Sequence, residues 1–550
     1  MVGPELFATA LWRHARAPAV GRDHAAYTFL EHGEREATRW SGAELVGKAN
    51  ALAHRLLALG LRDQPVLLVQ QGPDFVLAMC ACLLAQVIAV PLPDVGAARH
   101  AARIAGIMRV ARPRAVLCTT LQADEAREGL LAELPWIATD EPLEAALPPL
   151  PPPSPEAVAF LQFTSGSTRE PRGVVVRQDN LAANLAMIRK AFRFDDHQHD
   201  CVVTWLPPFH DMGLVGGLLT PLAVGVPCVA MTPLSFMQKP ERWLAAMSRY
   251  RGTVSGGPDF AYALCATRAQ SRRPEGLDLS PWRLAFCGAE KVRRRTLERF
   301  EQAFAPAGFR GASLFPCYGL AEATLFVTGD WLRPGGTGPE VDCGPGQAGQ
   351  ELRIVDPETG AALPEGSPGE LLVAGPHVSP GYWEDPAATA ESFGAQASTD
   401  DSRRYLRTGD IGVLRGGRLT ISGRIKHIVI IRSVKHHAED VEASVGRCHP
   451  ALENGGTAAF AADAARGEEL IVLQEVGARR LEPAMLEEIR AMIAAVLAEE
   501  HGVKAGEIVL VPRWSLPRTS SGKLMRAQCR AAHAAGSLRV LVAPAAVVTA

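Results

Sequence analysis

The chain has 550 residues, of which 47% are hydrophobic and 21% charged, a composition typical of globular proteins. Its 57 Lys and Arg nearly balance its 59 Asp and Glu, and no basic block indicates a nucleic-acid surface. The eleven cysteines show no Cys-x-x-Cys pair and no regular spacing, which argues against disulfides and zinc sites. The length exceeds what one hydrophobic core serves, so we expect about three or four domains or subdomains.

The N-terminal stretch MVGPELFATALWRHARAP has charges that interrupt a short apolar run, so we expect no signal peptide. No apolar run reaches the length that a membrane span needs. These two observations favour a cytoplasmic protein.

Residues 1 to about 147 alternate between helical and strand-like patterns. Apolar spacing predicts helices over 41–58 and 75–86, the first opening on a Ser41-x-x-Glu44 capping box. Short apolar runs predict strands over 66–70 and 87–92. This alternation predicts an α/β layer with a largely parallel sheet. The proline-rich stretch 148–155 then reads as a stiff spacer before the next strand.

A hydroxyl-rich turn follows the strand predicted over 158–163. It consists of Thr164, Ser165, Gly166, Ser167 and Thr168, and a second β-branched run follows at 174–176. Hydroxyl and backbone donors on one tight turn suit an anion such as a triphosphate, although no Gly-Lys-Ser/Thr opens a helix as in a Walker loop. An ordinary Ser/Thr-rich surface turn would have the same sequence pattern. The turn alone therefore does not distinguish a phosphate site from a surface turn without function. Asp179 and Asn180 are good N-cap residues for the helix that follows.

Three more loops at the ends of predicted strands carry polar or aromatic residues. His210 follows a strand and a Pro-Pro turn, and it precedes an apolar helix over 212–222 whose glycines leave room for a neighbour or an apolar ligand. Gly288, Ala289 and Glu290 end a strand that starts at Leu284, and Tyr318 and Gly319 end another, with Glu322 three residues later. Open α/β sheets bind ligands at such strand ends. Taken singly, His210 and Tyr318 also fit core packing, and Glu322 fits a helix first-turn charge.

The pattern changes at about residue 341. Short strands over 352–355, 369–374 and 419–421 predict a small β-barrel or sheet, with Asp410 at a turn. An α+β region follows, with helices over 438–447 and 483–500 and strands over 428–431 and 469–475. We therefore place an N-terminal domain at 1–422 and a C-terminal domain at 423–550. The second domain carries Lys523 in a Ser-Ser-Gly-Lys loop, and we expect its last residues, 536–550, to be poorly ordered.

Six motifs occur in the order found in one enzyme superfamily: TSGST at 164–168, CGAE at 287–290, YGLAEAT at 318–324, TGD at 408–410, GRIK at 423–426 and TSSGK at 519–523. Over nearly its whole length the chain resembles the acyl-adenylate-forming superfamily of acyl-CoA synthetases, adenylation domains and luciferase. WLPPFHDMGL at 205–214 and GGPDFAYALC at 256–265 resemble its fatty acyl-AMP ligase branch, which serves polyketide and nonribosomal peptide pathways. The resemblance implies a large N-terminal domain of two α/β subdomains and a small β-barrel, followed by a small mobile α+β domain.

The resemblance also implies a role for each motif residue. Thr164, Ser165, Gly166, Ser167 and Thr168 would hold the β- and γ-phosphates of ATP. Gly288, Ala289 and Glu290, with Tyr318 and Gly319, would form the adenine site. Asp410 would bind the ribose hydroxyls and Arg424 would support the nucleotide. Glu322 would hold Mg²⁺, a cation that prefers oxygen ligands. His210 would lie at the mouth of the acyl tunnel, Lys523 would reach the carboxylate and the α-phosphate, and Lys426 would be the hinge.

The implied reaction joins a medium- or long-chain fatty acid to AMP, releases pyrophosphate, and then moves the acyl group to the phosphopantetheine of an acyl carrier protein. No carrier Asp-Ser-Leu motif appears, so we expect that carrier to be a separate chain. The chain departs from the family pattern in two places: Arg169 and Arg172 stand where many relatives have Gly and Lys, and only residues 329–343 follow Thr328, where the branch usually has an insertion that disfavours coenzyme A.

Three alternatives stay open. A fatty acyl-CoA ligase would share the fold, and the short segment after Thr328 favours it. An amino- or aryl-acid adenylating enzyme is disfavoured because the neighbourhood 236–238 has no acidic partner for an α-amine. A non-catalytic relative is disfavoured by the presence of Glu322, Asp410 and Lys523.

Overall fold

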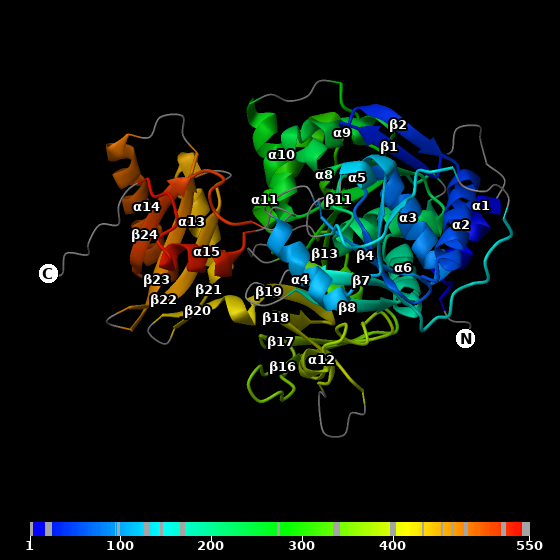
Figure 1. Cartoon of the computed structure of the whole chain (residues 1–550). Helices are drawn as coiled ribbons and strands as arrows, with labels where there is room; N and C mark the ends of the chain where they lie inside the picture. Colours follow the sequence, from blue (N-terminus) through cyan, green and yellow to red (C-terminus); the bar gives the residue numbers. More distant parts are fainter. Residues whose placement is uncertain are drawn as a thin grey trace. The chain divides into compact units, whose positions relative to one another are not determined.

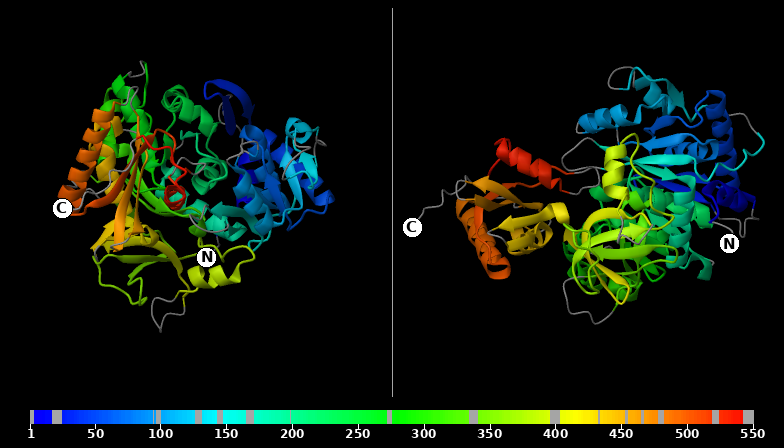
Figure 2. Two further views of the ribbon diagram at one scale, coloured as in Figure 1. Left: turned by 60° about the vertical axis from the view of Figure 1, so that its left-hand side comes forward. Right: turned by 90° about the horizontal axis from the view of Figure 1, so that it is seen from below.

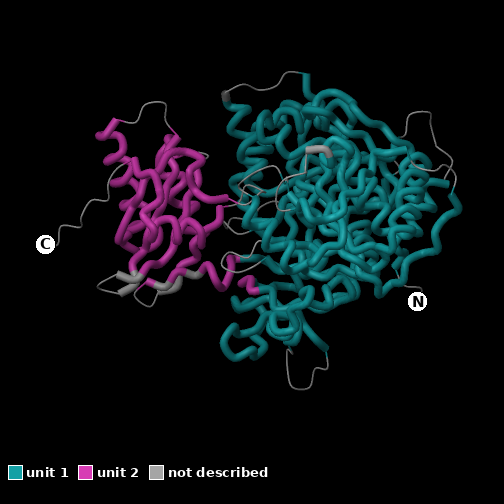
Figure 3. The backbone as a smooth tube through the Cα atoms, in the orientation of Figure 1, with its two compact units in different colours: residues 1–164, 171–408, 412–421 teal, residues 165–170, 409–411, 422–550 magenta. Residues whose placement is uncertain are grey.

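The computed structural model describes residues 4–16, 25–93, 95, 100–125, 131–142, 147–164, 171–197, 199–271, 276–333, 341–395, 403–431, 434–452, 455–464, 467–477, 482–518 and 524–541. The chain forms two compact units: residues 1–164, 171–408 and 412–421 make the first, and residues 165–170, 409–411 and 422–550 the second (Figure 1, Figure 3). Within the described ranges, no helix combines the length and apolar character that a membrane crossing needs.

The first unit contains a six-stranded sheet in the order β6-β5-β3-β4-β7-β8, parallel except for the last pair. Its strands are β6 Trp136–Ala138, β5 Ala115–Cys118, β3 Pro65–Leu68, β4 Ile88–Pro91, β7 Val158–Thr164 and β8 Arg172–Arg177. Side chains alternate between its faces. Val66 and Leu68 pack with helices α2 (Gly42–Ala58) and α3 (Gly72–Ala85), whereas Leu67 packs with α4 (Ala101–Ala111). The predicted parallel α/β layer is confirmed.

An eight-stranded sheet in the order β14-β13-β12-β11-β9-β10-β1-β2 supplies the other α/β layer, parallel except at its two outermost pairs. Its strands are β14 Phe326–Gly329, β13 Leu314–Gly319, β12 Leu284–Cys287, β11 Val254–Gly257, β9 Val202–Thr204, β10 Cys228–Met231, β1 Tyr27–Glu31 and β2 Arg35–Trp40. Its helices include α1 (Phe7–Arg16), α6 (Gln178–Ala191), α7 (Thr220–Val224), α9 (Glu241–Arg249), α10 (Asp259–Ser271) and α11 (Arg294–Phe304). An aromatic cluster fixes α9 and α11, with Trp243 edge-on to Trp282 at 5.2 Å.

A five-stranded sheet in the order β15-β19-β18-β17-β16 follows in the chain. Its strands are β15 Asp342–Pro345, β19 Arg418–Arg424, β18 Leu406–Arg415, β17 Gly369–Ala374 and β16 Glu351–Val355, accompanied by α12 (Pro386–Phe393). Leu371 and Val373 of β17 form one apolar cluster with Leu320 and Val327. The sheet therefore supports the segment between β13 and β14, which carries Glu322.

The second unit is built on a three-stranded sheet of β22 (Thr457–Ala464), β23 (Gly467–Val476) and β24 (Ala505–Pro512) (Figure 2). Alternating side chains cover both faces. Val472 packs with α13 (Ala438–Arg447) and α14 (Pro483–His501), whereas Leu473 packs with Cys529 of α15 (Arg526–Ala534). A two-stranded sheet of β20 (Ile428–Ile431) and β21 (Val434–His437) completes the unit. The fold class predicted from the sequence, α/β followed by a smaller α+β part, is confirmed.

Two local expectations are resolved at helix starts. The Ser41 capping box is present, because Ser41 Oγ accepts from Glu44 N and the Glu44 carboxylate accepts from Ser41 N. The predicted N-cap of α6 is wrong, because β8 continues to Arg177 and this residue caps the helix. Asn180 instead reaches back from inside the helix, where its side-chain oxygen accepts from Arg177 N at 3.1 Å.

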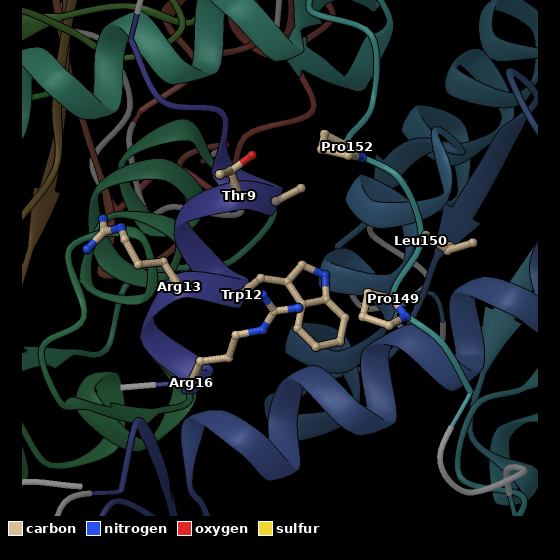
Figure 4. Close-up of a pocket in the computed structure, with 8 residues that line it drawn as sticks. Thr9, Trp12, Arg13, Arg16, Pro149, Leu150 and Pro152 are labelled. Carbon is tan, nitrogen blue, oxygen red and sulfur yellow. The ribbon is translucent and has the colours of Figure 1, made fainter. Parts of the chain in front are cut away.

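The proline-rich spacer is fixed against the first helices. The Asn50 amide donates to the carbonyls of Leu147 and Pro148 at 3.1 and 3.0 Å, and its oxygen accepts from Leu150 N at 3.2 Å. A pocket of about 440 Å³ lies between this segment and α1 (Figure 4), lined by Ala8, Thr9, Trp12, Arg13, Arg16, Pro149, Leu150 and Pro152. None of the predicted site residues lines this pocket.

Candidate active site

The turn predicted to bind phosphate joins two paired strands. Thr164 is the last residue of β7 and lies opposite Arg172 of β8 in the antiparallel register, so the two strands predicted on either side of the turn are confirmed. Ser165, Gly166, Ser167 and Thr168 lie outside the described residues. Phosphate binding at this turn therefore stays a prediction.

His210 lies in a tight turn that is tied to the phosphate strand. The turn closes through His210 N, which donates to Pro207 O at 3.1 Å. The buried Gln162 of β7 donates through its amide to Phe209 O at 2.7 Å. This bond joins the last strand before the phosphate turn to the residue next to His210. The side chain of His210 is half-buried, so it is not simply a core residue.

The helix after His210 is a π-helix over Met212–Leu219 that continues as α7. Asp211 caps it by accepting from Met212 N at 2.8 Å. A Cβ on Gly213 would lie 2.0 Å from Pro207 O, and one on Gly217 would lie 2.6 Å from Thr204 Oγ1. The space that these two glycines provide is therefore filled by neighbouring parts of the chain. π-Helices are rare and occur often at functional sites.

The loop after β12 carries Gly288, Ala289 and Glu290. A Cβ on Gly288 would lie 2.8 Å from Cys317 O, so the loop passes directly over β13. Ala289 is exposed with a left-handed φ of 65°, a backbone conformation that residues other than glycine seldom adopt. Glu290 has a structural bond, because one carboxylate oxygen accepts from Phe260 N at the start of α10 at 2.8 Å. The nucleotide roles of all three residues stay predictions.

Tyr318 and Gly319 close β13. Tyr318 pairs with Thr328 of β14 and packs partly buried beside the five-stranded sheet. A Cβ on Gly319 would lie only 1.8 Å from Leu325 O, so this turn excludes every side chain. The half-buried faces of Tyr318 and Gly319 lie at the carboxyl end of a parallel strand, which is the edge where α/β sheets bind ligands.

Glu322 follows β13 at the same edge of the sheet, and two hydrogen bonds fix its position. Its backbone oxygen accepts from Ser379 N at 2.9 Å. Its Oε1 accepts from the hydroxyl of Tyr382 at 3.0 Å. Glu322 itself is half-buried in a short 3-10 turn, Ala321–Ala323. Its backbone and one carboxylate oxygen are therefore both placed by the same neighbouring segment.

Thr324, two residues later, has a strained backbone. Its φ of 67° and ψ of −54° match the rare γ-turn, and Leu325 N donates to Ala323 O at 2.7 Å across it. The fully buried Asn184 of α6 holds Phe326, two residues further on, because it donates to Phe326 O at 2.8 Å and accepts from Phe326 N at 3.1 Å. Thr324 Oγ1 donates to His377 O at 2.8 Å. Such strain persists only where the surrounding bonds over-determine the turn.

Asp410 and Arg424 belong to the second unit and form an ion pair. Arg424 Nε lies 2.6 Å from Asp410 Oδ1, and Asp410 is buried at 3% exposure. The sequence predicts that both residues contact the nucleotide. The structure adds that they contact each other, so Arg424 orients the carboxylate predicted to bind ribose. Lys426, the predicted hinge, is exposed in the short turn Ile425–His427 that follows.

Lys523 lies outside the described residues, but both ends of its loop are placed. Arg518 pairs with Leu524 across the base in an isolated antiparallel bridge. Glu475, buried at 0% exposure, accepts from Leu516 N at 2.9 Å and from Arg518 Nη2 at 2.8 Å. The Glu475 carboxylate therefore fixes the segment that leads into the loop.

A second ionic cluster holds the other side of the loop. Arg526 donates two hydrogen bonds of 2.7 Å to Glu442, and His427 lies 2.7 Å from Glu439. Burial by itself would raise the pKa of Glu439, but the hydrogen bond from His427 and the charge of Arg526 outweigh it and lower the pKa to about 2. This cluster joins the turn that contains Lys426 to the helix that begins three residues after Lys523.

In the first unit the structure brings together the end of β7, the His210 turn and the segments that follow β12 and β13. Gln162 joins β7 to the His210 turn, and the contact of Gly288 with Cys317 joins the loops after β12 and β13. A Cβ on Gly216 would lie 3.2 Å from Leu325, so the π-helix also meets the segment that carries Glu322. Sequence reasoning missed Gln162, Asn184, Ser379 and Tyr382. Only the Pro-Gly-Tyr-Trp stretch at 380–383 offers a local signal, as a turn with an aromatic.

Comparison with known proteins decides the family. A model described as AMP-binding enzyme matches residues 14–383, and one described as Disco-interacting protein 2-like, AMP domain, matches residues 426–542. The chain belongs to the AMP-binding enzyme family. The family membership predicted from the six motifs is thereby confirmed. The prediction that the chain is an enzyme that uses ATP is confirmed as well.

Named relatives of this AMP-binding enzyme cover nearly its whole length. It is 35% identical to the medium-chain-fatty-acid–acyl-carrier-protein ligase JamA of Moorena producens, over 93% of each chain. It is 32% identical to the long-chain-fatty-acid–AMP ligase FadD26 of Mycobacterium marinum, over 92% of this chain and 94% of the relative. The crystal structure of a fatty acyl-adenylate ligase from L. pneumophila, in complex with acyl adenylate and pyrophosphate, matches with a TM-score of 0.72 at 33% identity, covering 98% and 97%.

Proposed function

We propose that this AMP-binding enzyme activates a medium- or long-chain fatty acid with ATP, forming acyl-AMP and pyrophosphate, and then passes the acyl group to the phosphopantetheine thiol of a separate acyl carrier protein. The observation that carries the proposal is the set of contacts that joins β7, the His210 turn and the segments after β12 and β13, in a chain that matches a medium-chain-fatty-acid–acyl-carrier-protein ligase over 93% of each chain. The Legionella relative binds acyl adenylate and pyrophosphate, the products of the first step.

The first step brings two anions together, a carboxylate and the α-phosphate, so positioning and charge neutralisation carry most of the rate. In the proposal Lys523 supplies positive charge to the reacting oxygens. His210 lies beside the fatty carboxylate at the end of β9. The hydroxyl-rich turn Thr164 to Thr168 holds the β- and γ-phosphates, and Tyr318 stacks on adenine.

Glu322 is the residue proposed to hold Mg²⁺. Among the described residues, no group of three or more His, Cys, Asp or Glu side chains could hold a metal ion. A single carboxylate is nevertheless a suitable donor set, because Mg²⁺ keeps several waters and binds through one or two carboxylates together with substrate phosphates. The hydrogen bond from Tyr382 uses Oε1 of Glu322, so Oε2 is the oxygen that suits the cation. When bound, Mg²⁺ would neutralise phosphate charge.

The main alternative concerns the acceptor of the acyl group, which could be coenzyme A instead of a carrier protein. Another relative, 33% identical, is named a putative fatty-acid–CoA ligase. The connection between β14 and β15 is also short. Arg418 binds both of its described ends, with Nη1 2.9 Å from Asp330 and Nε 2.5 Å from Asp342. A fatty acyl-CoA ligase is therefore the second candidate.

One experiment tests both steps. Pyrophosphate release is measured with ATP, Mg²⁺ and a panel of C6 to C18 fatty acids, amino acids and aryl acids. We expect turnover with fatty acids alone. The same mixture is then offered phosphopantetheinylated carrier protein or coenzyme A in separate reactions. Carrier loading without acyl-CoA formation supports the proposal. Rapid acyl-CoA formation without carrier loading would show that coenzyme A, and not a carrier protein, is the acceptor. Turnover confined to amino or aryl acids would show that the substrate is not a fatty acid.

A further inference from the structure

We propose that Tyr382 is a positioning residue that fixes the Glu322 carboxylate for a divalent cation and joins it to Arg172, the residue that leads out of the phosphate turn. This inference rests on the proposed function, because it takes Glu322 to be the cation carboxylate. It adds a residue that no predicted motif contains.

The proposal starts from a side-chain hydrogen bond between Tyr382 and Glu322. The Tyr382 hydroxyl donates to Glu322 Oε1 at 3.0 Å, and Glu322 lies 60 residues earlier in the chain. Donors to an ionised carboxylate make hydrogen bonds about twice as strong as neutral pairs do. The bond occupies one oxygen and sets the plane of the carboxylate. The second oxygen is thereby oriented before any cation arrives.

Tyr382 can perform this task because its backbone is fixed to β8. Val174 of β8 forms an antiparallel bridge with Tyr382. On either side of that bridge, Val175 N donates to Gly381 O at 3.0 Å and Trp383 N donates to Gly173 O at 2.7 Å. Tyr382 N donates to Thr389 Oγ1 at 2.9 Å. The segment therefore behaves as a further strand on the edge of the six-stranded sheet.

The ring of Tyr382 is also held by its neighbours. Phe393 packs edge-on to it with centroids 5.2 Å apart, and the Arg172 guanidinium lies over the ring, 5.2 Å from its centre. A ring held on both sides keeps its hydroxyl directed at Glu322.

Arg172 connects this arrangement to the phosphate turn. It lies opposite Thr164 in the β7–β8 register, and its Nε is 3.9 Å from Asp385 Oδ2. One side chain thus contacts the ring that orients Glu322, while its backbone pairs with the first residue of the turn. One continuous set of contacts therefore runs from the Glu322 carboxylate through Tyr382 and Arg172 to Thr164, at the strand ends that flank the phosphate turn.

The test uses the full-length enzyme and measures cation binding directly. Free Mn²⁺ is titrated by electron paramagnetic resonance in the presence of a nonhydrolysable ATP analogue. We expect Tyr382→Phe, which keeps the ring and removes the hydroxyl, to weaken Mn²⁺ binding about tenfold, the lower end of what removal of a group orienting a metal ligand costs. The Mg²⁺ concentration for half-maximal pyrophosphate release should rise by the same factor, with the maximal rate within about threefold.

The chain offers a matched control. Tyr250 also donates its hydroxyl to a carboxylate, Glu36, at 2.6 Å, but this pair lies on the surface at β2, away from the predicted site residues. Tyr250→Phe should leave Mn²⁺ binding unchanged. If Tyr382→Phe binds Mn²⁺ like the wild type, or if both variants weaken binding equally, the inference is overturned.

Glu322→Gln separates this inference from the function on which it rests. If Glu322→Gln weakens Mn²⁺ binding and Tyr382→Phe does not, Tyr382 has no positioning role and the proposed function stands. If Glu322→Gln has no effect on Mn²⁺ binding, the proposed metal role of Glu322 fails, and the inference with it. When the inference holds, the double variant binds Mn²⁺ no more weakly than Glu322→Gln alone, because the two residues act through one contact.

Discussion

Replacing Asn184 tests how the Glu322 turn is held. Its buried side chain gives one donor and one acceptor to the backbone of Phe326. Alanine would leave both backbone groups buried without this partner, and each such group costs about 1–3 kcal/mol. We therefore expect Asn184→Ala to lower the free energy of unfolding by about 2–6 kcal/mol.

The same substitution should also lower activity in the protein that remains folded. The γ-turn at Thr324 stores about 1–3 kcal/mol of backbone strain, and Asn184 holds the residues that follow it. Once Asn184 is removed the turn can relax, and Glu322 moves with it. Displacement of a group by 1 Å can cost about 10²-fold in rate, so we expect adenylation to fall by about 10- to 100-fold.

Asn50→Ala is the matched control for this prediction. Asn50 is also buried and its three hydrogen bonds likewise go to the backbone, but it holds the proline-rich spacer. Urea unfolding should show a similar loss of stability in both variants. Pyrophosphate release, measured where both are folded, should fall in Asn184→Ala and stay within about twofold of wild type in Asn50→Ala. Equal activity in the two variants would refute the reasoning.

Three further predictions concern the second unit. Lys523→Ala should lose about 10²–10³ in the rate of pyrophosphate release with an unchanged circular dichroism spectrum, since it removes charge from the reacting centre, and near wild-type turnover would remove Lys523 from the chemistry. Asp410→Ala should weaken binding of a nonhydrolysable nucleotide in isothermal titration more than it lowers the maximal rate, whereas unchanged affinity would leave Asp410 only its bond to Arg424. The pKa of Glu439 is lowered from 4.5 to about 2, so its ion pairs stabilise the fold above pH 4.5 and lose that effect as the pH falls from about 4.5 towards 2. Glu439→Gln should flatten acid unfolding over that interval, and an unaltered profile would contradict the lowered pKa.

Much of the fold could be predicted because its signals are local. Buried parallel strands such as β3 and β4 are short continuous apolar runs, and the Ser41 capping box needs only two residues three apart. The loops after β9, β12 and β13 could be located for the same reason, since each follows such a run. The start of α6 was missed by two residues because its apparent caps lie inside the helix, where Asn180 bonds back to Arg177.

The contacts that fix the site could not be predicted in this way. Asn184 and Phe326 are 142 residues apart, and Tyr382 and Glu322 are 60 apart. Neither pair has a spacing that one helix or strand would reveal. Asp410 and Arg424 could each be assigned to the nucleotide from their motifs, yet their ion pair appears only when β18 and β19 are neighbours. Long-range pairing thus determines how each motif residue is oriented.

The crowding around Gly319 has a consequence for sequence evolution. A Cβ there would lie 1.8 Å from Leu325 O, and one on Gly213 would lie 2.0 Å from Pro207 O. Each clash is with a backbone oxygen, so any larger residue would force the backbone to move. Gly47, in α2, would meet nothing within 4 Å. Selection for a working site should therefore hold positions 213 and 319 at glycine while position 47 drifts. A duplicated gene whose product has lost glycine at position 319 can no longer encode the turn before Glu322. Substitution at this one position would indicate that the product is no longer under selection for adenylation.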